Sequence, residues 1–381
     1  MKKICVVIGT RPEAIKMAPV VLALRAQPDC FDVTVCSTGQ HSTMLNGAMA
    51  AFELKPDVEL GVMNPGQSLA ELTSRLLLTL DALFEKIRPD LVLVHGDTTS
   101  AMVGSQVAFY RQIEVGHVEA GLRTGNLLSP FPEEYNRRSV AIATRHHFAP
   151  TPRARANLER EGIAPSNIIV TGNTVIDALL LTIRTLEDRP QELTRLRTRL
   201  RTQIGFNIEE QRFILITAHR RENFGTGLHN ICVSIRALAK ANPGLNFIYP
   251  VHLNPKVKDV VERMLTDEPN VVLAPPQDYK DFAWLLRHCL FVLTDSGGIQ
   301  EEAPALGKPV LVMRDTSERP EAIEAGTAKL VTTDSIKVIC ETQTLISDEA
   351  AFEAMARAIN PFGDGHAAER ISKYLMGVSA K

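Results

Sequence analysis

Residues 290–312 read LFVLTDSGGIQEEAPALGKPVLV, which is an apolar run, a turn with two glycines and a second apolar run. The first run has the composition of a buried strand, and the segment after the turn favours a helix. A strand that turns into a helix through Ser296, Gly297 and Gly298 leaves backbone N–H groups unpaired, and glycine lets a bulky group approach them. Such donors attract an anion such as phosphate. Glu302 follows one turn later, where it is placed to accept hydrogen bonds from hydroxyl groups.

Two interpretations of this turn stay open from its residues alone. In the first, phosphate donors followed by a hydroxyl acceptor form half of a nucleotide site. In the second, the segment is an ordinary strand-to-helix turn whose acids, Glu301 and Glu302, suit the positive end of the helix dipole. Glycine-rich turns are common, so the rest of the chain has to decide between them.

The same alternation of short apolar runs and longer helical stretches extends along the whole chain. The first half contains the runs KICVVIG, FDVTVCS, LVLVHGD, IEVGHVE, HHFAPT and NIIVTGN, and the second half FILITAH, NFIYPVH, NVVLAPP, LFVLT, PVLVMRD and AKLV. Apolar strands that alternate with helices predict parallel sheets covered on both faces. We therefore expect an α/β protein with two doubly wound, Rossmann-like domains whose polar strand ends face a cleft.

Length and composition agree with two domains and narrow the class of protein. The chain has 381 residues, which is too many for one ordinary core. We expect an N-terminal domain over 1–175 and a C-terminal domain over 176–365. The net charge of −2 gives no general attraction to nucleic acid or to a membrane surface. The six cysteines form no Cys-x-x-Cys pair, and the N-terminus has only a short apolar run, so we expect a cytoplasmic protein without disulfides.

In the first domain, two cations and three acids follow predicted strands, where ligands of open α/β sheets bind. Arg11 and Lys16 in GTRPEAIK can hold a diphosphate, or simply lie on a solvated helix face. Asp97 in HGDTTS is either a helix cap or a catalytic acid. Glu119 stands in a glycine-bracketed loop, and Glu133 has the spacing of a helix ion pair with Arg137. Three carboxylates gathered from separate segments are costly without a use, which favours proton transfer.

The second domain supplies more cations and an aromatic stretch. His219 follows the strand FILIT, and Arg319 follows PVLV. An imidazolium among arginines indicates phosphate, because no spacing of metal ligands accompanies it. Gln277 and Phe282 can read and pack a uracil ring, or else belong to a helix that buries an aromatic stripe. The chain has no G-x-G-x-x-G fingerprint, so we expect no dinucleotide redox cofactor.

Taken together, these motifs closely resemble the bacterial non-hydrolysing UDP-N-acetylglucosamine 2-epimerases. The segments that carry the resemblance, in order, are GTRPEAIKMAPV, HGDTTSA, GHVEAGLRTG, PEEYNRR, TGNTVIDAL, TAHRRENFG, YPVHLNP and TDSGGIQEEAPALGKPVLVMRDTSERPEA. They span nearly the whole chain. The resemblance implies a glycosyltransferase-B fold, a homodimer, no cofactor and no metal, and a C-terminal helix, 366–381, packed back on the first domain.

The resemblance also implies an activity and a set of site residues. The activity is reversible epimerisation at C2 of UDP-N-acetylglucosamine, which supplies N-acetylmannosamine units for cell-surface polysaccharide. The implied catalytic residues are Asp97, Glu119, Glu133 and His219. The implied substrate-binding residues also include Arg11, Lys16, Gln277, Phe282, Ser296, Gly297, Gly298, Glu302 and Arg319.

One part of the family pattern is only partly kept. Gln40 and His41 lie in the region tied in relatives to a second, activating UDP-N-acetylglucosamine, but Ser42, Thr43 and Gly66 depart from it. Allosteric activation through Gln40 and His41 is therefore an open expectation. The alternatives for the activity are a 2-epimerase of a related UDP-2-acetamido sugar and a glycosyltransferase of the same fold.

Overall fold

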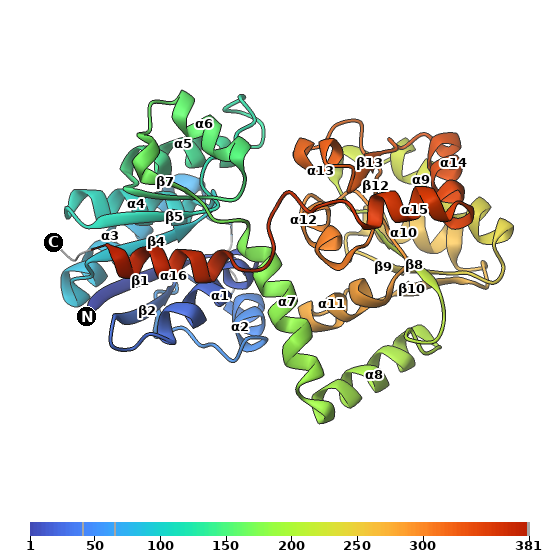
Figure 1. Cartoon of the computed structure of the whole chain (residues 1–381), viewed down its shortest axis with the longest axis horizontal. Coiled ribbons are helices and arrows are strands. Elements are labelled where there is room, and N and C mark those ends of the chain that lie inside the picture. The colour runs from blue at the N-terminus through green and yellow to red at the C-terminus, as the bar shows by residue number, and fades with distance from the viewer. Residues whose placement is uncertain (40–41, 65, 379–381) are drawn as a thin grey trace. The chain divides into compact units, whose positions relative to one another are not determined.

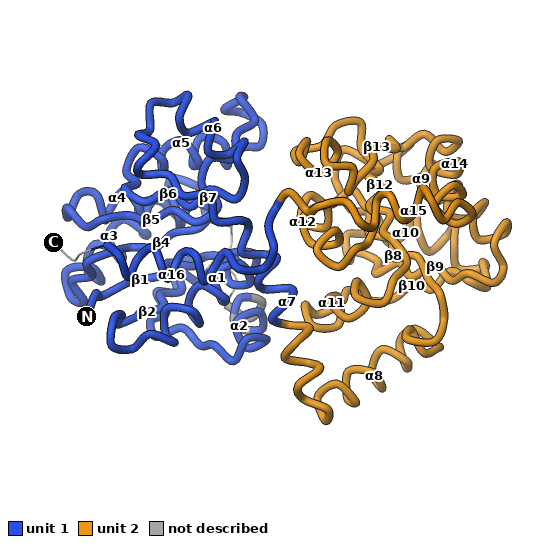
Figure 2. Tube along the Cα trace, in the orientation of Figure 1, with its two compact units in different colours: residues 1–181, 362–381 blue, residues 182–361 orange. Residues whose placement is uncertain are grey.

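A computed structural model describes residues 1–39, 42–64 and 66–378 of the chain. The chain divides into two compact units, one formed by Met1–Leu181 and Phe362–Lys381 and the other by Thr182–Pro361 (Figure 2). It passes from the first unit to the second within helix α7 (Thr174–Glu187) and returns after Pro361. The two units are described separately.

The first unit is built on a seven-stranded sheet in which every neighbouring pair of strands is parallel (Figure 1). Its strand order is β3-β2-β1-β4-β5-β6-β7. The strands are β1 (Lys2–Ile8), β2 (Phe31–Ser37), β3 (Val58–Glu59), β4 (Leu91–His95), β5 (Glu114–Val118), β6 (His146–Ala149) and β7 (Ile168–Val170). The six runs expected from the sequence are all strands; β3, two residues at the sheet edge, is too short to leave an apolar pattern.

Helices connect these strands and cover the sheet. They are α1 (Arg11–Arg25), α2 (Ser42–Ala50), α3 (Leu69–Ile87), α4 (Thr99–Tyr110), α5 (Glu133–Ala143) and α6 (Pro152–Arg160), with a short 3₁₀ turn η1 (Pro165–Asn167). Helix α3 shows why they pack: Leu72, Leu76 and Leu80 recur at a four-residue spacing and are buried in one core with strand residues. The last helix, α16 (Ala367–Gly377), packs against α1.

The second unit repeats this plan with a six-stranded parallel sheet. Its order is β10-β9-β8-β11-β12-β13. The strands are β8 (Phe213–Thr217), β9 (Asn246–Pro250), β10 (Val271–Ala274), β11 (Val292–Thr294), β12 (Val310–Val312) and β13 (Ala328–Leu330). The helices are α8 (Pro190–Ile204), η2 (Arg221–Asn223), α9 (Thr226–Ala241), α10 (Pro255–Leu265), α11 (Tyr279–His288), α12 (Ile299–Glu302), η3 (Ala303–Leu306), α13 (Pro320–Glu324), α14 (Ser335–Ser347) and α15 (Glu349–Ala356).

Both sheets confirm the predicted doubly wound fold, and each has one point where the strand order reverses. In the first sheet this point lies between β1 and β4, and in the second between β8 and β11. Loops that leave neighbouring strands in opposite directions leave a crevice there, which is where α/β proteins bind ligands. Within the described part of the chain, no helix has the length and apolar character needed to span a membrane.

Candidate active site

The loop after β1 begins α1 with a reciprocal cap. Thr10 is the N-cap residue, and its N–H donates to Oε2 of Glu13 at 2.7 Å. Arg11 is the first residue of the helix and has no hydrogen-bond or ion-pair partner among the residues that the structure describes. Lys16 lies just over one turn later and forms an ion pair with Glu119, which follows β5. The two cations expected here therefore lie at the switch point of the first sheet.

Glu13 connects this loop to the loop after β4. Its Oε1 accepts from the hydroxyl of Thr98 at 2.8 Å, and its Oε2 accepts from the N–H of Gly9 at 3.0 Å. Thr98 in turn caps α4 by accepting from the N–H of Ala101 at 3.0 Å. Burial raises the pKa of Glu13 to about 7, although the hydrogen bonds from Thr10 and Thr98 act in the opposite direction.

The Glu13→Gln variant is expected to gain stability relative to the wild type as pH rises. Because the native pKa lies near 7 and the ordinary value is 4.5, the native state holds a proton in this interval that the unfolded state has lost. The free energy of unfolding of the wild type therefore falls by up to about 3 kcal/mol between about pH 4.5 and 7. The amide of the variant does not titrate, so the variant has no such loss. Thermal unfolding of both proteins at pH 5 and pH 8 measures this; a difference that stays the same at both pH values would contradict it.

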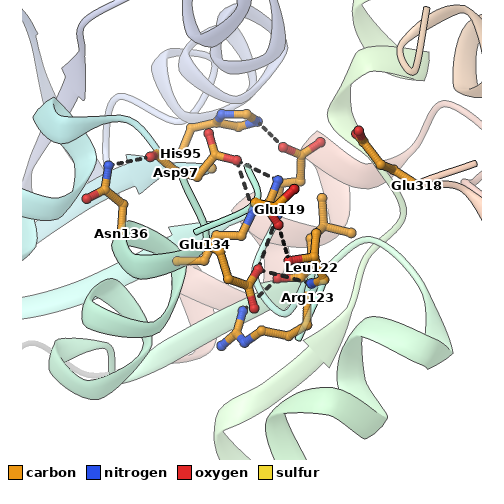
Figure 3. A network of polar contacts seen from close by, with 12 residues as sticks. His95, Asp97, Glu119, Leu122, Arg123, Glu134, Asn136 and Glu318 are labelled. Carbon is orange, nitrogen blue, oxygen red and sulfur yellow. Dashed lines mark hydrogen bonds and ion pairs between the residues drawn. The ribbon is translucent and has the colours of Figure 1, made fainter. Parts of the chain in front are cut away.

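Asp97 lies two residues after β4 and is held by two residues of α5. Arg137 donates from Nε to Oδ2 of Asp97 at 2.9 Å. Figure 3 shows the second contact, in which Asn136 donates from Nδ2 to the Asp97 carbonyl at 2.8 Å. Burial raises the pKa of Asp97; Arg137 opposes this, and the negative charges of Glu119 and Glu133 add to it. Asp97 does not cap α4, because Thr98 is the N-cap residue.

Glu119 is turned into this region by an unusual backbone conformation. Its φ is 65°, in the left-handed region that residues other than glycine rarely adopt. The amide of Asn173 donates to its Oε1 at 2.9 Å, and Lys16 contacts the same oxygen. The other oxygen, Oε2, lies 3.6 Å from Nε2 of His95. The sequence pattern gave no reason to select His95 or Asn173, whose roles depend on contacts across the sheet edge.

Glu133 begins α5 but does not form the ion pair that its spacing suggested. Arg137 instead contacts Asp97, with Nη2 2.7 Å from Oδ2, and Glu134, with Nη1 3.4 Å from Oε2. Oε2 of Glu133 is buried and has no hydrogen-bond partner among the described residues. Glu134 is fully buried and accepts from the N–H of Thr124 at 3.0 Å, so it is the structural acid of this pair. The negative charge of Glu133 adds to the burial that raises the pKa of Asp97.

At the switch point of the second sheet, Asp295 holds the loop after β8. It is fully buried, and its Oδ2 accepts from the backbone N–H groups of His219 and Arg220, both at 2.8 Å. Nδ1 of His219 lies 3.8 Å from Oδ1 of Asp295. The His219 ring also stacks on His252, with ring centroids 5.3 Å apart and planes inclined by 11°. His252, from the PVHLNP segment that follows β9, is a further residue that the sequence analysis did not select.

The environment of His219 favours its neutral form and not the imidazolium expected from the sequence. Burial lowers the pKa of the ring; the charge of Asp295 opposes this, and His252 and Arg220 add to it. The imidazole is nevertheless exposed, with 43% of its side chain accessible. Because the buried carboxylate of Asp295 fixes the backbone of His219, the exposed ring can contact a ligand without a change in backbone conformation.

The turn Ser296-Gly297-Gly298 leaves its backbone open. The N–H of Ser296 donates to Oγ1 of Thr294 at 2.9 Å, but those of Gly297 and Gly298 have no acceptor among the described residues. Neither glycine has a positive φ. A Cβ on Gly297 would lie 3.4 Å from Nη2 of Arg220, and one on Gly298 at least 3.8 Å from any neighbour, so packing does not require glycine either. The open N–H groups favour the anion-site interpretation.

The helix after this turn is short. Helix α12 has four residues and continues as the 3₁₀ turn η3, which contains Pro304. Proline lacks the N–H that a longer α-helix would use. The predicted anion site therefore depends on the open N–H groups more than on the dipole of a long helix.

Three further candidates of the second unit, Glu302, Arg319 and Gln277, contact different kinds of protein group. Glu302 is 8% exposed and accepts from the hydroxyl of Tyr279 at 3.4 Å. Arg319 forms an ion pair with the buried Glu301. The amide nitrogen of Gln277 donates to the Pro275 carbonyl at 2.6 Å, and its Oε1 is buried without a partner among the described residues.

Three candidates from the sequence remain: Phe282, Gln40 and His41. Phe282 is partly buried on α11, whose aromatic stripe is completed by the buried Trp284. Gln40 and His41 lie outside the described residues, so their expected allosteric role stays a prediction. In the described part of the chain, no group of three or more His, Cys, Asp or Glu side chains is arranged to hold a metal ion.

Two parallel α/β units, each with polar groups at its switch point, define the class of proteins with a glycosyltransferase-B type of fold. Solved structures place the chain in this class. A UDP-GlcNAc 2-epimerase from Neisseria meningitidis bound to UDP-GlcNAc is 46% identical, with a TM-score of 0.89 and coverage of 99% of this chain and 100% of that one. A Staphylococcus aureus protein, MnaA, in a structure with UDP is 40% identical, with a TM-score of 0.84 and coverage of 100% and 98%.

The sequence comparisons narrow the class to one family. The family profile described as UDP-N-acetylglucosamine 2-epimerase matches residues 22–376. A probable UDP-N-acetylglucosamine 2-epimerase of Ralstonia solanacearum is 50% identical over 380 residues, covering 100% of both chains. The UDP-N-acetylglucosamine 2-epimerase of Escherichia coli K12 is 50% identical over 373 residues, covering 98% of each. The chain belongs to the UDP-N-acetylglucosamine 2-epimerase family.

Proposed function

We propose that the protein catalyses the reversible epimerisation of UDP-N-acetylglucosamine at C2 to UDP-N-acetylmannosamine, and so supplies N-acetylmannosamine units for cell-surface polysaccharide. The observation that carries this proposal is a set of three carboxylates on neighbouring elements: Asp97 and Glu119 follow the paired strands β4 and β5, Glu133 begins α5, and the charges of Glu119 and Glu133 both act on Asp97. Burial and mutual repulsion hold the pKa of Asp97 above its ordinary range, which is suited to proton transfer. The family to which the chain belongs gives these groups their substrate.

The proposed chemistry begins with elimination of UDP. No carbonyl acidifies the C2–H bond of this sugar, so proton removal needs help from C1. As the C1–O bond breaks and its electron pair leaves with UDP, C1 gains oxocarbenium character and the C2–H bond becomes acidic. A carboxylate accepts the C2 proton, and the electrons of the C–H bond form the C1=C2 double bond of 2-acetamidoglucal. This route uses no redox cofactor.

Re-addition then completes the inversion. A proton is delivered to C2 from the opposite face, and the UDP oxygen attacks C1 again. Proton transfer on both faces needs more than one acid or base, which fits a group of three carboxylates. General acid–base help of this kind is typically worth about 10²–10⁴-fold in rate.

We assign the remaining site residues to the binding of UDP. Arg11, Lys16, His219 and Arg319 stabilise the charge that develops on the leaving diphosphate, which is often the larger catalytic term. The open N–H groups of Gly297 and Gly298, with Ser296, bind a phosphate. Glu302 accepts from the ribose hydroxyls. Gln277 and Phe282 contact the uracil.

Hydrogen exchange tests the proposal directly. The purified protein is incubated with UDP-N-acetylglucosamine in deuterated water and followed by proton NMR. We expect UDP-N-acetylmannosamine with deuterium at C2, and deuterium at C2 of the recovered substrate. Sugar transfer to an added acceptor without exchange at C2 would show a glycosyltransferase instead, and exchange only with a diacetamido UDP sugar would show the related epimerase.

The Glu302→Ala variant is expected to bind UDP about 5-fold to 150-fold more weakly, which corresponds to about 1–3 kcal/mol for a lost hydrogen bond to a charged group. Calorimetric titration with UDP measures this. Asp267→Ala, which removes an exposed acid from the loop after α10, is the matched control and should bind like the wild type. An unchanged affinity in Glu302→Ala would make this residue only an acid near a helix start.

We further propose that the protein is a homodimer that uses the outer helices of the first unit. Large apolar side chains are exposed on three of them: Leu78 of α3 at 73%, Tyr110 of α4 at 66% and Ile142 of α5 at 84%. Helix α3 packs against α4, and α4 against α5, so these residues lie on adjacent helices. Exposed apolar side chains on neighbouring elements indicate an interface.

The Ile142→Glu variant is therefore expected to be monomeric at concentrations where the wild type is dimeric, because a charge placed in an apolar interface is not solvated. Light scattering coupled to gel filtration measures the mass. The matched control is Ile336→Glu, which changes an isoleucine of α14 that is 74% exposed in the second unit. Equal masses for the wild type and both variants would exclude this surface.

The proposal includes a cytoplasmic location. All six cysteines are free thiols, as expected in a reducing compartment.

A further inference from the structure

His95 stands beside the proposed catalytic group but is absent from the roles assigned above. It is the last residue of β4 and is only 4% exposed. Its Nε2 lies 3.6 Å from Oε2 of Glu119 and has no hydrogen-bond partner among the described residues (Figure 3). A buried ring nitrogen without a partner is costly, and the nearest group that can relieve it is this carboxylate.

A second histidine of the same region shows what a purely structural role looks like. His117, on the neighbouring strand β5, is also buried, but its Nε2 lies 2.7 Å from the Gly96 carbonyl oxygen and is satisfied by the backbone. His95 has no such backbone partner at Nε2. Because Nδ1 of His117 is itself buried without a partner, the feature that distinguishes His95 is the carboxylate of Glu119 beside its Nε2.

The charges around His95 determine its protonation state. Burial lowers its pKa to about 4; Glu119, from the end of β5, opposes this, and Lys16, from α1, adds to it. His117, on β5, is a further titratable group on which His95 acts. The ring is therefore neutral near pH 7 and carries one N–H, which points toward Glu119 in the tautomer that has its hydrogen on Nε2. A neutral donor can orient a carboxylate without neutralising its charge.

We propose that His95 is a positioning residue for Glu119, whose Oε2 receives the Nε2–H of the imidazole while Lys16 and Asn173 hold Oε1. This inference rests on the proposed function of Glu119 as an acid–base group. With both oxygens held, the carboxylate keeps one orientation through repeated gain and loss of a proton. The contact also stabilises the charged form of Glu119 and so tunes its basicity.

Two substitutions separate this role from simple packing. His95→Leu removes the donor, and His95→Gln retains an N–H at the position of Nε2. We expect His95→Leu to lower kcat by about 10-fold to 100-fold, as for a misplaced catalytic group, with KM within about twofold. The acidic limb of its kcat profile moves to higher pH, because the carboxylate loses a donor. His95→Gln recovers most of kcat and the original limb.

His147→Leu is the matched control, since His147 is a fully buried histidine of the same sheet, on strand β6, which is separated from β4 by β5. It should lower thermal stability without moving the pH profile. If His95→Leu does not fold, His95→Asn replaces it, because an asparagine amide ends short of the position of Nε2. A loss of kcat that His147→Leu matches, a raised KM at unchanged kcat, or an unshifted acidic limb would overturn the proposal.

A measurement without turnover keeps this test separate from that of the proposed function. The carboxyl carbon of Glu119 is observed by NMR in protein labelled with ¹³C-glutamate and assigned by its loss in Glu119→Gln. We expect its pKa to be higher in His95→Leu than in the wild type and in His95→Gln. Equal values in all three would refute the contact even in an active enzyme. The expected shift in a protein that does not epimerise would refute only the proposed function.

Discussion

Replacing Asp97, Glu119 or Glu133 by its amide is expected to lower kcat at least about 10²-fold in each case, because each amide retains the shape of the side chain but cannot carry a proton. UDP binding should be retained, since Gly297 and Glu302, the proposed ligands of phosphate and ribose, belong to the other unit and the cations Arg11 and Lys16 are unchanged in all three variants. Turnover is measured by NMR and UDP affinity by calorimetry, on the same preparations.

A matched control for these three variants lies in the same sheet. Asp90 precedes β4 and accepts from the N–H of Lys3 at 2.7 Å, at the amino-terminal edge of the sheet and away from the switch point. Asp90→Asn should therefore leave turnover unchanged. Near-normal turnover in all three site variants would remove the carboxylates from the mechanism. A large loss of UDP affinity in one of them would instead make that residue a ligand.

Replacing His219 by asparagine is expected to release the intermediate. In the proposed mechanism the glycal and UDP are held together by no covalent bond, so re-addition depends on how firmly the diphosphate is gripped. His219 is positioned for this by Asp295, which fixes its backbone N–H and lies beside its ring. A smaller side chain slows elimination and raises the share of events that end in release. Free UDP and 2-acetamidoglucal should accumulate during long incubation with excess substrate.

Mass spectrometry and the vinyl C1–H signal in proton NMR detect the glycal. The wild type should release much less per epimerisation event, and so should His229→Asn, which changes an exposed histidine of α9. If free N-acetylmannosamine appears with UDP and no glycal is seen even at early times, the enzyme hydrolyses its substrate and re-addition does not occur.

The order of elements was predictable because it depends on local patterns. Runs such as LVLVH and FILIT are buried on both faces of their sheets, and this burial requires the continuous apolar character that identifies them. Strand β3 was not predicted, because two residues are too few to show a periodic pattern. The helix expected after Gly298 is present as α12, but it has only four residues, because its conformation tightens into a 3₁₀ turn at Pro304.

The residues of the candidate site were predictable by position, because strand ends can be located from the pattern and polar groups there are conspicuous. The hydrogen-bond and ion-pair partners of these residues were less predictable. The helical spacing of Glu133 and Arg137 allowed an ion pair that does not form, because Arg137 reaches Asp97 on the loop after β4 instead. Helical spacing identifies ion-pair partners within one helix only. It gives no information about a charged side chain on another segment that lies closer.

The sequence by itself determined two parallel α/β domains, the family resemblance and the chemical types gathered at the strand ends, because each of these depends on residue identity and short-range spacing. Only the tertiary structure decided how those groups are held. The left-handed backbone of Glu119, its contacts with Lys16 and Asn173, and the unpartnered nitrogen of His95 arise between segments far apart in the chain. Burial and neighbouring charge, which set the pKa of a carboxylate, exist only once those segments are packed together.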